Sequence, residues 1–178
     1  MGFLKYIRTY KTVLVVFLAI TAGLTSCTVK YSMSGASISP ELKTVSVAYF
    51  QNQAPIALPS LTQLLTESLR DKCRNQTRLT LLNENGDVSF DGEVVGYDTR
   101  PTAIQGNDIA AKNRFTIKVK VRFTNIVDTK QSYEQTFERY TDFNGNQTLT
   151  DIENDGKTIK DLVDLLTEDI FNKAFANW

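Results

Sequence analysis

One strictly alternating segment carries the residues whose type and spacing could bind an anion. It reads RFTIKVKVRF and spans residues 114–123, with an apolar side chain at every odd position. Because successive side chains of a strand point to opposite faces, its basic residues share the other face: Arg114, Lys118, Lys120 and Arg122. A row of guanidinium and ammonium groups suits phosphate. The alternative interpretation is that the row is the solvated side of a sheet, neutralised by acids on neighbouring strands.

Little else in the chain suggests chemistry. The sequence has no histidine, which excludes Ser–His and Cys–His catalysis and removes the commonest metal ligand. It has no phosphate-binding glycine loop, and pairs such as Asp87 and Asp91 resemble ordinary surface acids. Cys73 falls on an apolar helical stripe, where we expect a small buried hydrophobe. We therefore expect no enzyme, no metal and no cofactor other than a covalent lipid. The first 27 residues indicate that lipid.

The first 27 residues have the pattern of a lipoprotein signal. A segment with three basic residues and no acid comes first, followed by an apolar run at residues 13–24. This run is shorter than the roughly 20 residues of a membrane span and matches the apolar core of a signal peptide. It leads into Leu24-Thr25-Ser26-Cys27, which resembles a bacterial lipobox. We expect cleavage before Cys27 and lipidation of Cys27; the alternative is an uncleaved anchor.

Cleavage would divide the chain into a signal peptide (1–26), a lipidated tether (27–42) and a single α/β domain (43–178). Removing 26 of the 178 residues leaves 152, the size of one domain. Three of the 20 basic residues leave with the signal, so 17 basic residues face 20 acidic ones, a net charge of −3. A mildly acidic chain does not predict nucleic-acid binding. Any anion site must therefore be local.

Two segments have the periodicity of amphipathic helices. Ser60 and Gln63 predict a capping box for the first, whose apolar stripe is Leu61, Leu64, Leu65, Leu69 and Cys73. Thr150 and Glu153 predict a second box, before a stripe of Ile159, Leu162, Val163, Leu166 and Ile170. Gly156 weakens the start of this helix, because glycine costs about 1 kcal/mol relative to alanine. We expect Phe171, Phe175 and Trp178 to lie in the core, the alternative being contact with a partner.

The remaining regular segments predict strands, at residues 43–50, 78–83, 88–98, 114–126 and 130–143. A long irregular loop at 99–113 precedes the basic strand. The order of elements is strand, helix, several antiparallel strands, helix, and every element has one apolar face. These features favour an α+β fold: a two-layer sandwich of a mostly antiparallel or mixed sheet, with two helices packed on one face. The other face of the sheet is then polar.

The two last strands also predict their own register. Odd positions are apolar on both, so paired positions must sum to an even number, and a connection at 127–129 meets this condition. It places Arg122 opposite Glu134, Lys118 opposite Glu138, and Val119 opposite Phe137. If the strand with Asp91 and Glu93 lies on the other flank, acids enclose the basic row, each cross-strand pair contributing roughly 0.2–1 kcal/mol. Arg114 and Lys120 have no acid opposite them in this interpretation, which keeps anion binding open.

Several linked segments resemble the LptE family of lipopolysaccharide-assembly lipoproteins, in its Bacteroidota form. They are YSMSGASI (31–38), RLTLLNENGDVSFDGEVVGY (78–97), AIQGND (103–108), NRFTIKVKVRFTN (113–125) and DIFNKAFANW (169–178). The resemblance implies a sheet with two helices on one side. It also implies a complex in which the lipoprotein plugs a large outer-membrane β-barrel, LptD, and assists delivery of lipopolysaccharide.

The resemblance places the expected protein at the outer membrane, lipid-anchored and facing the periplasm. Thr28 is not the aspartate that would imply inner-membrane retention, and no acidic cluster follows Cys27. Contact residues do not transfer by motif, so our hypothesis is that the basic strand and the 99–113 loop face lipopolysaccharide or the barrel. The alternative function is a stand-alone periplasmic lipoprotein that binds an amphiphile or a cell-wall component.

Overall fold

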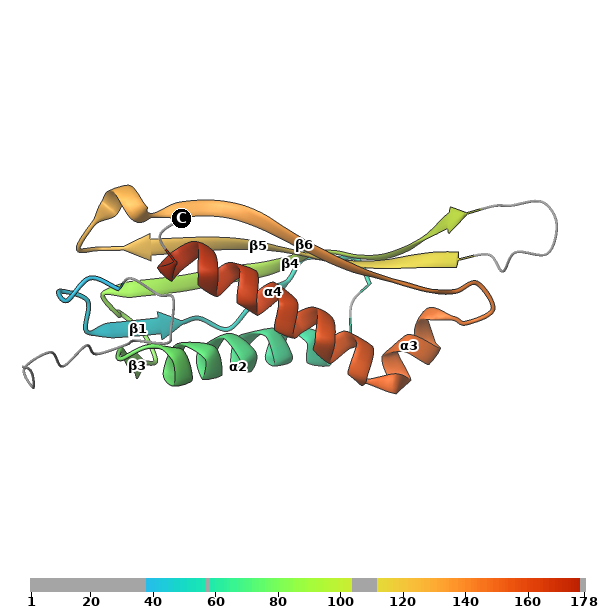
Figure 1. The fold of residues 1–178 in the computed structure, drawn as a ribbon, viewed down its shortest axis with the longest axis horizontal. Coiled ribbons are helices and arrows are strands. Elements are labelled where there is room, and N and C mark those ends of the chain that lie inside the picture. Colours follow the sequence, from blue (N-terminus) through green and yellow to red (C-terminus); the bar gives the residue numbers. More distant parts are fainter. Residues whose placement is uncertain (1–37, 57, 104–111, 177–178) are drawn as a thin grey trace, which may run out of the picture. The chain divides into compact units, whose positions relative to one another are not determined.

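The computed structural model describes residues 38–56, 58–103 and 112–176. The expected signal peptide, Cys27, most of the tether, the centre of the 99–113 loop and Trp178 lie outside these residues. The described elements are β1 (Thr44–Val47), β2 (Gln51–Asn52), α2 (Pro59–Gln76), β3 (Thr80–Leu82), β4 (Val88–Ala103), β5 (Lys112–Asn125), the 3-10 helix η1 (Thr129–Gln131), β6 (Tyr133–Asn144), α3 (Leu149–Asp155) and α4 (Lys157–Phe175) (Figure 1). No described helix is both long and apolar enough to span a bilayer.

The six strands form one mixed, open sheet. Its order is β3-β1-β4-β5-β6, and the short β2 pairs with β4. β1 runs parallel to both β3 and β4, and β2 runs parallel to β4, whereas the β4–β5 and β5–β6 pairs are antiparallel. The expected α+β fold with a mixed sheet is therefore confirmed.

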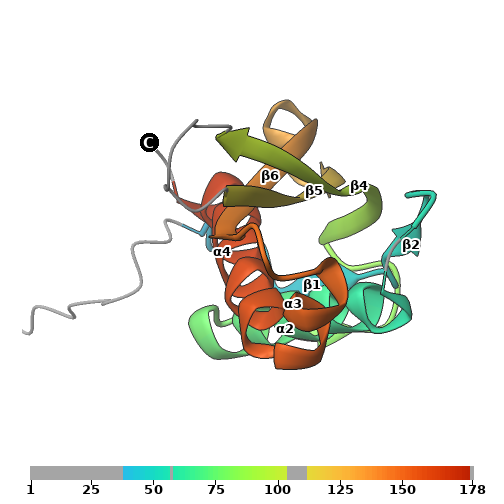
Figure 2. The ribbon, with the colours of Figure 1, turned by 90° about the vertical axis from the view of Figure 1, so that its right-hand side faces the viewer.

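The helices lie on one side of the sheet (Figure 2). α2 contacts β1 and β3, and α4 contacts β5 and β6. The odd residues of β5 are buried against them: Phe115, Ile117, Val119, Val121 and Phe123. The ring of Phe175 on α4 packs edge-on against Phe90 and Phe123, with ring centroids 5.9 Å away in both cases. Phe171 and Phe175 are 3% and 4% exposed. Both residues belong to the core, as expected.

The helix starts differ from the expected capping boxes. α2 begins at Pro59 with Leu58 as N-cap and no side-chain cap, because proline lacks an N–H and its fixed φ suits the first helical position. The second box is formed two residues earlier than expected, by Thr148 and Asp151, each bonding the backbone of the other. Gly156, at φ 63°, then separates α3 from α4. The expected C-terminal helix is thus two helices, and the weak point at Gly156 is their junction.

Close packing across the sheet depends on a glycine and a bulge in β4. A Cβ on Gly92 would lie 2.1 Å from the ring of Phe50, a fully buried side chain. Pairing with β5 shifts by one residue between Val94 and Gly96. Because a one-residue shift exchanges the two faces of a strand, Val94 and Tyr97 both point into the core, and Val95 is 37% exposed. Tyr97 also donates a hydrogen bond of 2.7 Å to Glu153 on α3.

The turn before β4 is tied to the start of β1 by Asp87. Its carboxylate accepts hydrogen bonds from the backbone N–H groups of Lys43 and Thr44, at 2.8 and 2.9 Å. The Thr44 hydroxyl in turn accepts from the Asp87 N–H at 2.8 Å. These bonds lower the pKa of Asp87 below its usual value. A side chain that looked like an ordinary surface acid therefore aligns two parallel strands.

The β5–β6 hairpin has the expected register. Arg122 pairs with Glu134, Lys118 with Glu138, and Val119 with Phe137. The connection is longer than the expected three residues, because β5 ends at Asn125 and η1 occupies Thr129–Gln131 before β6 begins. The last pair of the hairpin, Phe123 with Tyr133, is centred on residue 128, as the expected connection is, so the paired positions are the same.

Candidate functional site

The face of the sheet opposite the helices carries a continuous set of charged side chains, which we call the charged ladder. The set spans β4, β5 and β6. Its basic members all come from β5, and the acids come from the strands on both sides. The members are Glu93, Arg114, Lys118, Lys120, Arg122, Glu134, Glu138 and Asp142. The expected acid–base–acid arrangement is present.

Glu134 holds two bases at once. Its Oε2 accepts from Nε and Nη2 of Arg122 at 3.0 and 2.9 Å, while its Oε1 lies 2.8 Å from Nζ of Lys120. Lys120 also approaches Glu93 on β4, at 3.8 Å. Lys120 therefore links three strands through the two carboxylates that flank it.

Arg114 has an acid opposite it, contrary to expectation. Asp142 is its β6 partner and accepts from Arg114 Nε at 2.7 Å and Nη2 at 2.9 Å. The guanidinium also lies over the ring of Tyr140, 3.8 Å from the centroid. Positions 114 and 142 satisfy the same pairing rule as 122 and 134, so the sequence contained the signal for Asp142.

Lys118 completes the row. Its Nζ lies 2.8 Å from Oε2 of Glu138, and its stem lies over Gly96 on β4. A Cβ on Gly96 would be 3.0 Å from Lys118 Cγ. Because Gly96 has no side chain, the stem of Lys118 can pack against β4 while its ammonium group reaches Glu138 on β6.

Ion pairs stabilise the charged form of four ladder members, Arg114, Lys120, Glu134 and Asp142. Hydrogen bonds from Lys120 and Arg122 lower the pKa of Glu134, and those from Arg114 lower the pKa of Asp142. Hydrogen bonds to Glu134 raise the pKa of Lys120, and those to Asp142 raise the pKa of Arg114. Arg114, Lys120, Glu134 and Asp142 consequently stay charged at neutral pH.

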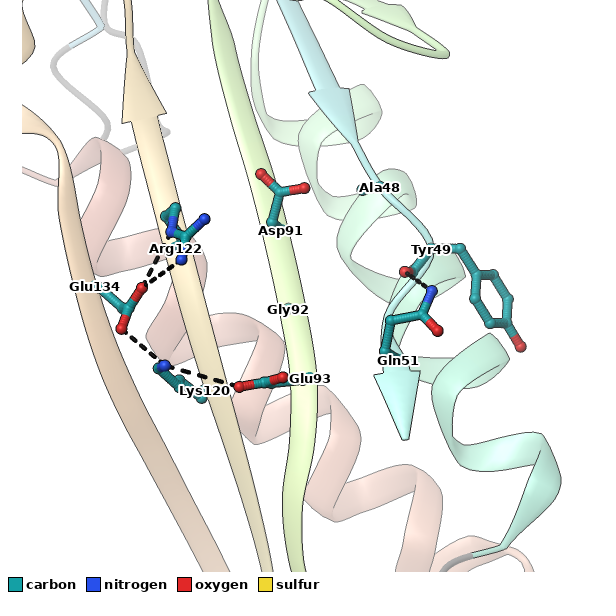
Figure 3. A pocket seen from close by; sticks show the side chains of 9 residues that line it. All are labelled: Ala48, Tyr49, Gln51, Asp91, Gly92, Glu93, Lys120, Arg122 and Glu134. Carbon is teal, nitrogen blue, oxygen red and sulfur yellow. Dashed lines mark hydrogen bonds and ion pairs between the residues drawn. The ribbon is translucent and has the colours of Figure 1, made fainter. Parts of the chain in front are cut away.

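A shallow cavity of about 290 Å³ opens between the ladder and the segment that joins β1 to β2. Figure 3 shows Lys120 and Arg122 both directed at Glu134, with Asp91 standing apart from them. Asp91 is opposite Arg122 in register, yet no ion pair joins them. The nine lining residues are Ala48, Tyr49, Gln51, Asp91, Gly92, Glu93, Lys120, Arg122 and Glu134.

This surface is suited to polar groups. At about 290 Å³, the cavity lies just below the roughly 300–1,000 Å³ range of ligand pockets, and its lining is more polar than theirs, so it suits polar groups better than acyl chains. The bases still have donors to offer: an ammonium has three N–H groups and a guanidinium five. Arg122 uses two of them on Glu134, and its side chain is 63% exposed. A phosphate or sugar group can therefore bond here without burial, in competition with the carboxylates.

Other residues singled out from the sequence lie away from the ladder. Cys73 lies on the buried face of α2 and is fully buried in the core, and burial raises the pKa of its thiol to about 12. It is the small buried hydrophobe expected, without nucleophilic character. Within residues 38–56, 58–103 and 112–176, no group of three or more His, Cys, Asp or Glu could hold a metal ion.

Sequence reasoning missed one ion pair that fixes the helix layer. Arg139 of β6 points to the helix side and makes two hydrogen bonds of 2.6 Å to the carboxylate of Asp169 on α4. Alternation alone indicates the face of Arg139, but its partner depends on how α4 crosses β6. No local pattern identifies it.

Comparison with known proteins gives a family. The model of the family LptE, described as lipopolysaccharide-assembly, matches residues 42–174. No curated protein matches the chain.

Solved structures similar to this chain include three bacterial lipoproteins. A minor lipoprotein of Acinetobacter baumannii is 14% identical, with 72% of this chain and 90% of that chain covered and a TM-score of 0.44. Lipoprotein B of Nitrosomonas europaea is 15% identical, with coverages of 76% and 83% and a TM-score of 0.49. The rare lipoprotein B of Shewanella oneidensis is 11% identical, with coverages of 71% and 91% and a TM-score of 0.42. At these values the likeness says nothing about ligands or partners.

Proposed function

Because this chain belongs to the LptE lipopolysaccharide-assembly family, we propose that it is an outer-membrane lipoprotein that plugs an LptD-type β-barrel. In this role it assists the assembly of lipopolysaccharide at the outer membrane. The anchor is a lipid on Cys27, and the domain faces the periplasm. The protein acts by binding, and no bond is made or broken.

The charge-balanced polar face of the sheet supports the plug role most directly. Lumens of membrane β-barrels are polar and contain water. The ladder offers such a lumen a flat surface whose bases are all paired with acids, so little charge is left to be desolvated unpaired. The apolar side chains of β5 are buried on the other face, under the helices, so β5 offers the lumen its polar side.

The same face supports contact with the polar part of lipopolysaccharide. Arg114, Lys118, Lys120 and Arg122 are the proposed contacts, because each keeps exposed N–H donors beyond those used on its acid. The cavity beside Lys120 and Arg122 suits a phosphate or sugar better than an acyl chain. On this proposal the lipid tails pass elsewhere.

A pull-down tests the proposal. The lipidated chain is purified from outer membranes in mild detergent, and the co-purifying proteins are identified. We expect a large β-barrel in stoichiometric amount. Recovery of the lipoprotein alone, under conditions that preserve other membrane complexes, would contradict the plug role and favour a stand-alone lipoprotein that binds an amphiphile or cell-wall component.

Depletion of the protein in cells gives an independent readout. A plug for lipopolysaccharide assembly should be essential, or its loss should make the envelope leaky. Normal growth with an intact permeability barrier would instead fit the stand-alone binder.

A further inference from the structure

The open edges of the sheet differ in how they are protected against pairing with another chain. β3 forms one edge and is only three residues long. The far half of β4 is a second edge, since β2 pairs with β4 only at Glu93 and Val94. That half contains the bulge at Val95 and Pro101, which has no N–H to donate. Short strands, bulges and prolines are the usual means of preventing edge pairing.

β6 has none of these three features. It is twelve residues long, contains no proline, and pairs with β5 without a register shift. It is the last strand in the sheet order, so its outer side pairs with no other described strand. Half of its backbone N–H and C=O groups point to that side, because a strand uses alternate residues for each neighbour.

We propose that the outer edge of β6 binds an extended segment of another polypeptide by strand addition, and that this segment carries a basic side chain at every fourth residue. Strand addition uses main-chain hydrogen bonds for affinity and alternate side chains for selectivity. On the ladder face of β6 the acids Glu134, Glu138 and Asp142 are four residues apart. Each has a base on its β5 side and none, among the described residues, on its outer side.

The same acids disfavour pairing between two copies of this chain. Two antiparallel registers overlap almost fully and keep the faces aligned. In one, Glu134 would lie opposite Asp142 and Glu138 opposite its own copy; in the other, the three acids would lie opposite Asn144, Tyr140 and Thr136. In the in-register parallel arrangement each acid would lie opposite itself. Like charges directly opposite one another destabilise a sheet. The acids therefore oppose the in-register parallel arrangement and one of the two antiparallel ones, while the edge remains open to a basic strand.

The helix side of β6 sets a second requirement. Gln135 is exposed there, and Arg139 is held by Asp169. An inward-pointing charge can protect an edge, but here the carboxylate of α4 neutralises it. The incoming segment should thus be polar and uncharged on this side, for example with threonines.

A designed peptide tests the inference directly. The probe is an end-blocked eleven-residue peptide with lysine at its second, sixth and tenth positions, valine at the fourth and eighth, and threonine elsewhere. The full chain in detergent micelles is titrated with it, and backbone amide exchange along β6 is followed by NMR. We expect exchange of alternate β6 amides to slow at least tenfold. No change in β6 up to millimolar peptide would overturn the proposal.

Two pairs of controls separate strand addition from general charge attraction. Two further peptides are N-methylated, one at the odd-numbered amides and one at the even-numbered amides. Since only every second amide faces β6, one of the two should lose binding and the other should keep it. Equal loss of binding with both methylated peptides would overturn the proposal. So would equal binding of a peptide with glutamate in place of its lysines. Glu138→Gln should weaken binding about two- to fivefold, whereas Glu168→Gln, which removes an exposed acid from α4, should not. None of these outcomes depends on lipopolysaccharide.

Discussion

Asp142 receives two parallel hydrogen bonds from Arg114, from Nε at 2.7 Å and from Nη2 at 2.9 Å, across the β5–β6 pair. The guanidinium is further stacked on Tyr140. This pair removes the strongest reason for treating the basic row as an empty anion site, because Arg114 was one of two bases thought to lack an acid. It is also the only bidentate pair among the described ladder contacts in which each carboxylate oxygen has its own donor.

We predict that Arg114 and Asp142 are coupled more strongly than Lys118 and Glu138. Bidentate guanidinium–carboxylate pairs hold one geometry, whereas an exposed lysine gains little from its acid. Double-mutant cycles with Arg114→Gln and Asp142→Asn, and with Lys118→Gln and Glu138→Gln, measure both couplings by urea unfolding. The first coupling should be larger and should fall as salt is added. Equal coupling free energies would mean that the bidentate geometry adds nothing to the stability of the pair.

Lipopolysaccharide binding should depend on the middle of the basic row. We predict that the triple variant Lys118→Gln, Lys120→Gln and Arg122→Gln binds lipopolysaccharide about tenfold more weakly at low salt. The difference should shrink at high salt, where charges are screened. Fluorescence titration of the full chain in detergent measures this.

A matched control is available on the helix layer. Arg74, Lys157 and Lys160 are also exposed bases in ion pairs, and their triple glutamine variant has the same change in net charge. Its affinity should stay close to that of the parent. Unchanged binding in a folded ladder variant would leave the row with a structural role alone.

Acid should destabilise the fold partly through Asp87. The pKa of Asp87 is lowered in the folded state by the N–H groups of Lys43 and Thr44. Its contribution is therefore complete above the unfolded pKa of about 3.9 and is lost as the pH falls through the lower folded pKa. Asp87→Asn should be less stable than the parent at pH 6, and the two unfolding free energies should converge towards pH 2. Parallel curves down to pH 2 would contradict this.

Gly92 should tolerate no side chain while Phe50 is present. Gly92→Ala places a methyl group 2.1 Å from a fully buried ring, and such overpacking costs about 1–3 kcal/mol. Adding Phe50→Leu should recover part of this loss, because the smaller side chain makes room. The loss is read from urea unfolding. Gly96→Ala is the comparison. The three atoms nearest to its Cβ would all belong to the Lys118 side chain, at 3.0–3.2 Å, so we expect a smaller loss of stability.

Alternation was enough to predict the β5–β6 pairing, because each face of these strands differs sharply in polarity. The rule that aligned Arg122 with Glu134 extends without change to Arg114 and Asp142. Applying it along the whole strand would have shown that Arg114 has an acid. The β5–β6 pairing rule does not predict the acids that bind Lys120. They are Glu134, a diagonal neighbour on β6, and Glu93 on β4.

The remaining features depend on contacts between distant parts of the chain. Asp87 looks like any turn acid until β1 lies beside it, and Gly92 gives no sign of the Phe50 ring above it. The cap of α3 was placed two residues late because Thr150 and Thr148 both precede acids at suitable spacing. Only the way β6 ends decides between them.

A ladder in which every base already holds a carboxylate has a kinetic consequence for any anion that moves along β5. Such an anion must compete with a carboxylate for each base that it contacts, so no position along the strand binds it with high affinity. Successive sites of modest and similar strength allow fast passage, because release from one site is never the slow event. A phosphate-bearing ligand would therefore pass quickly along the strand and would not be retained at one site.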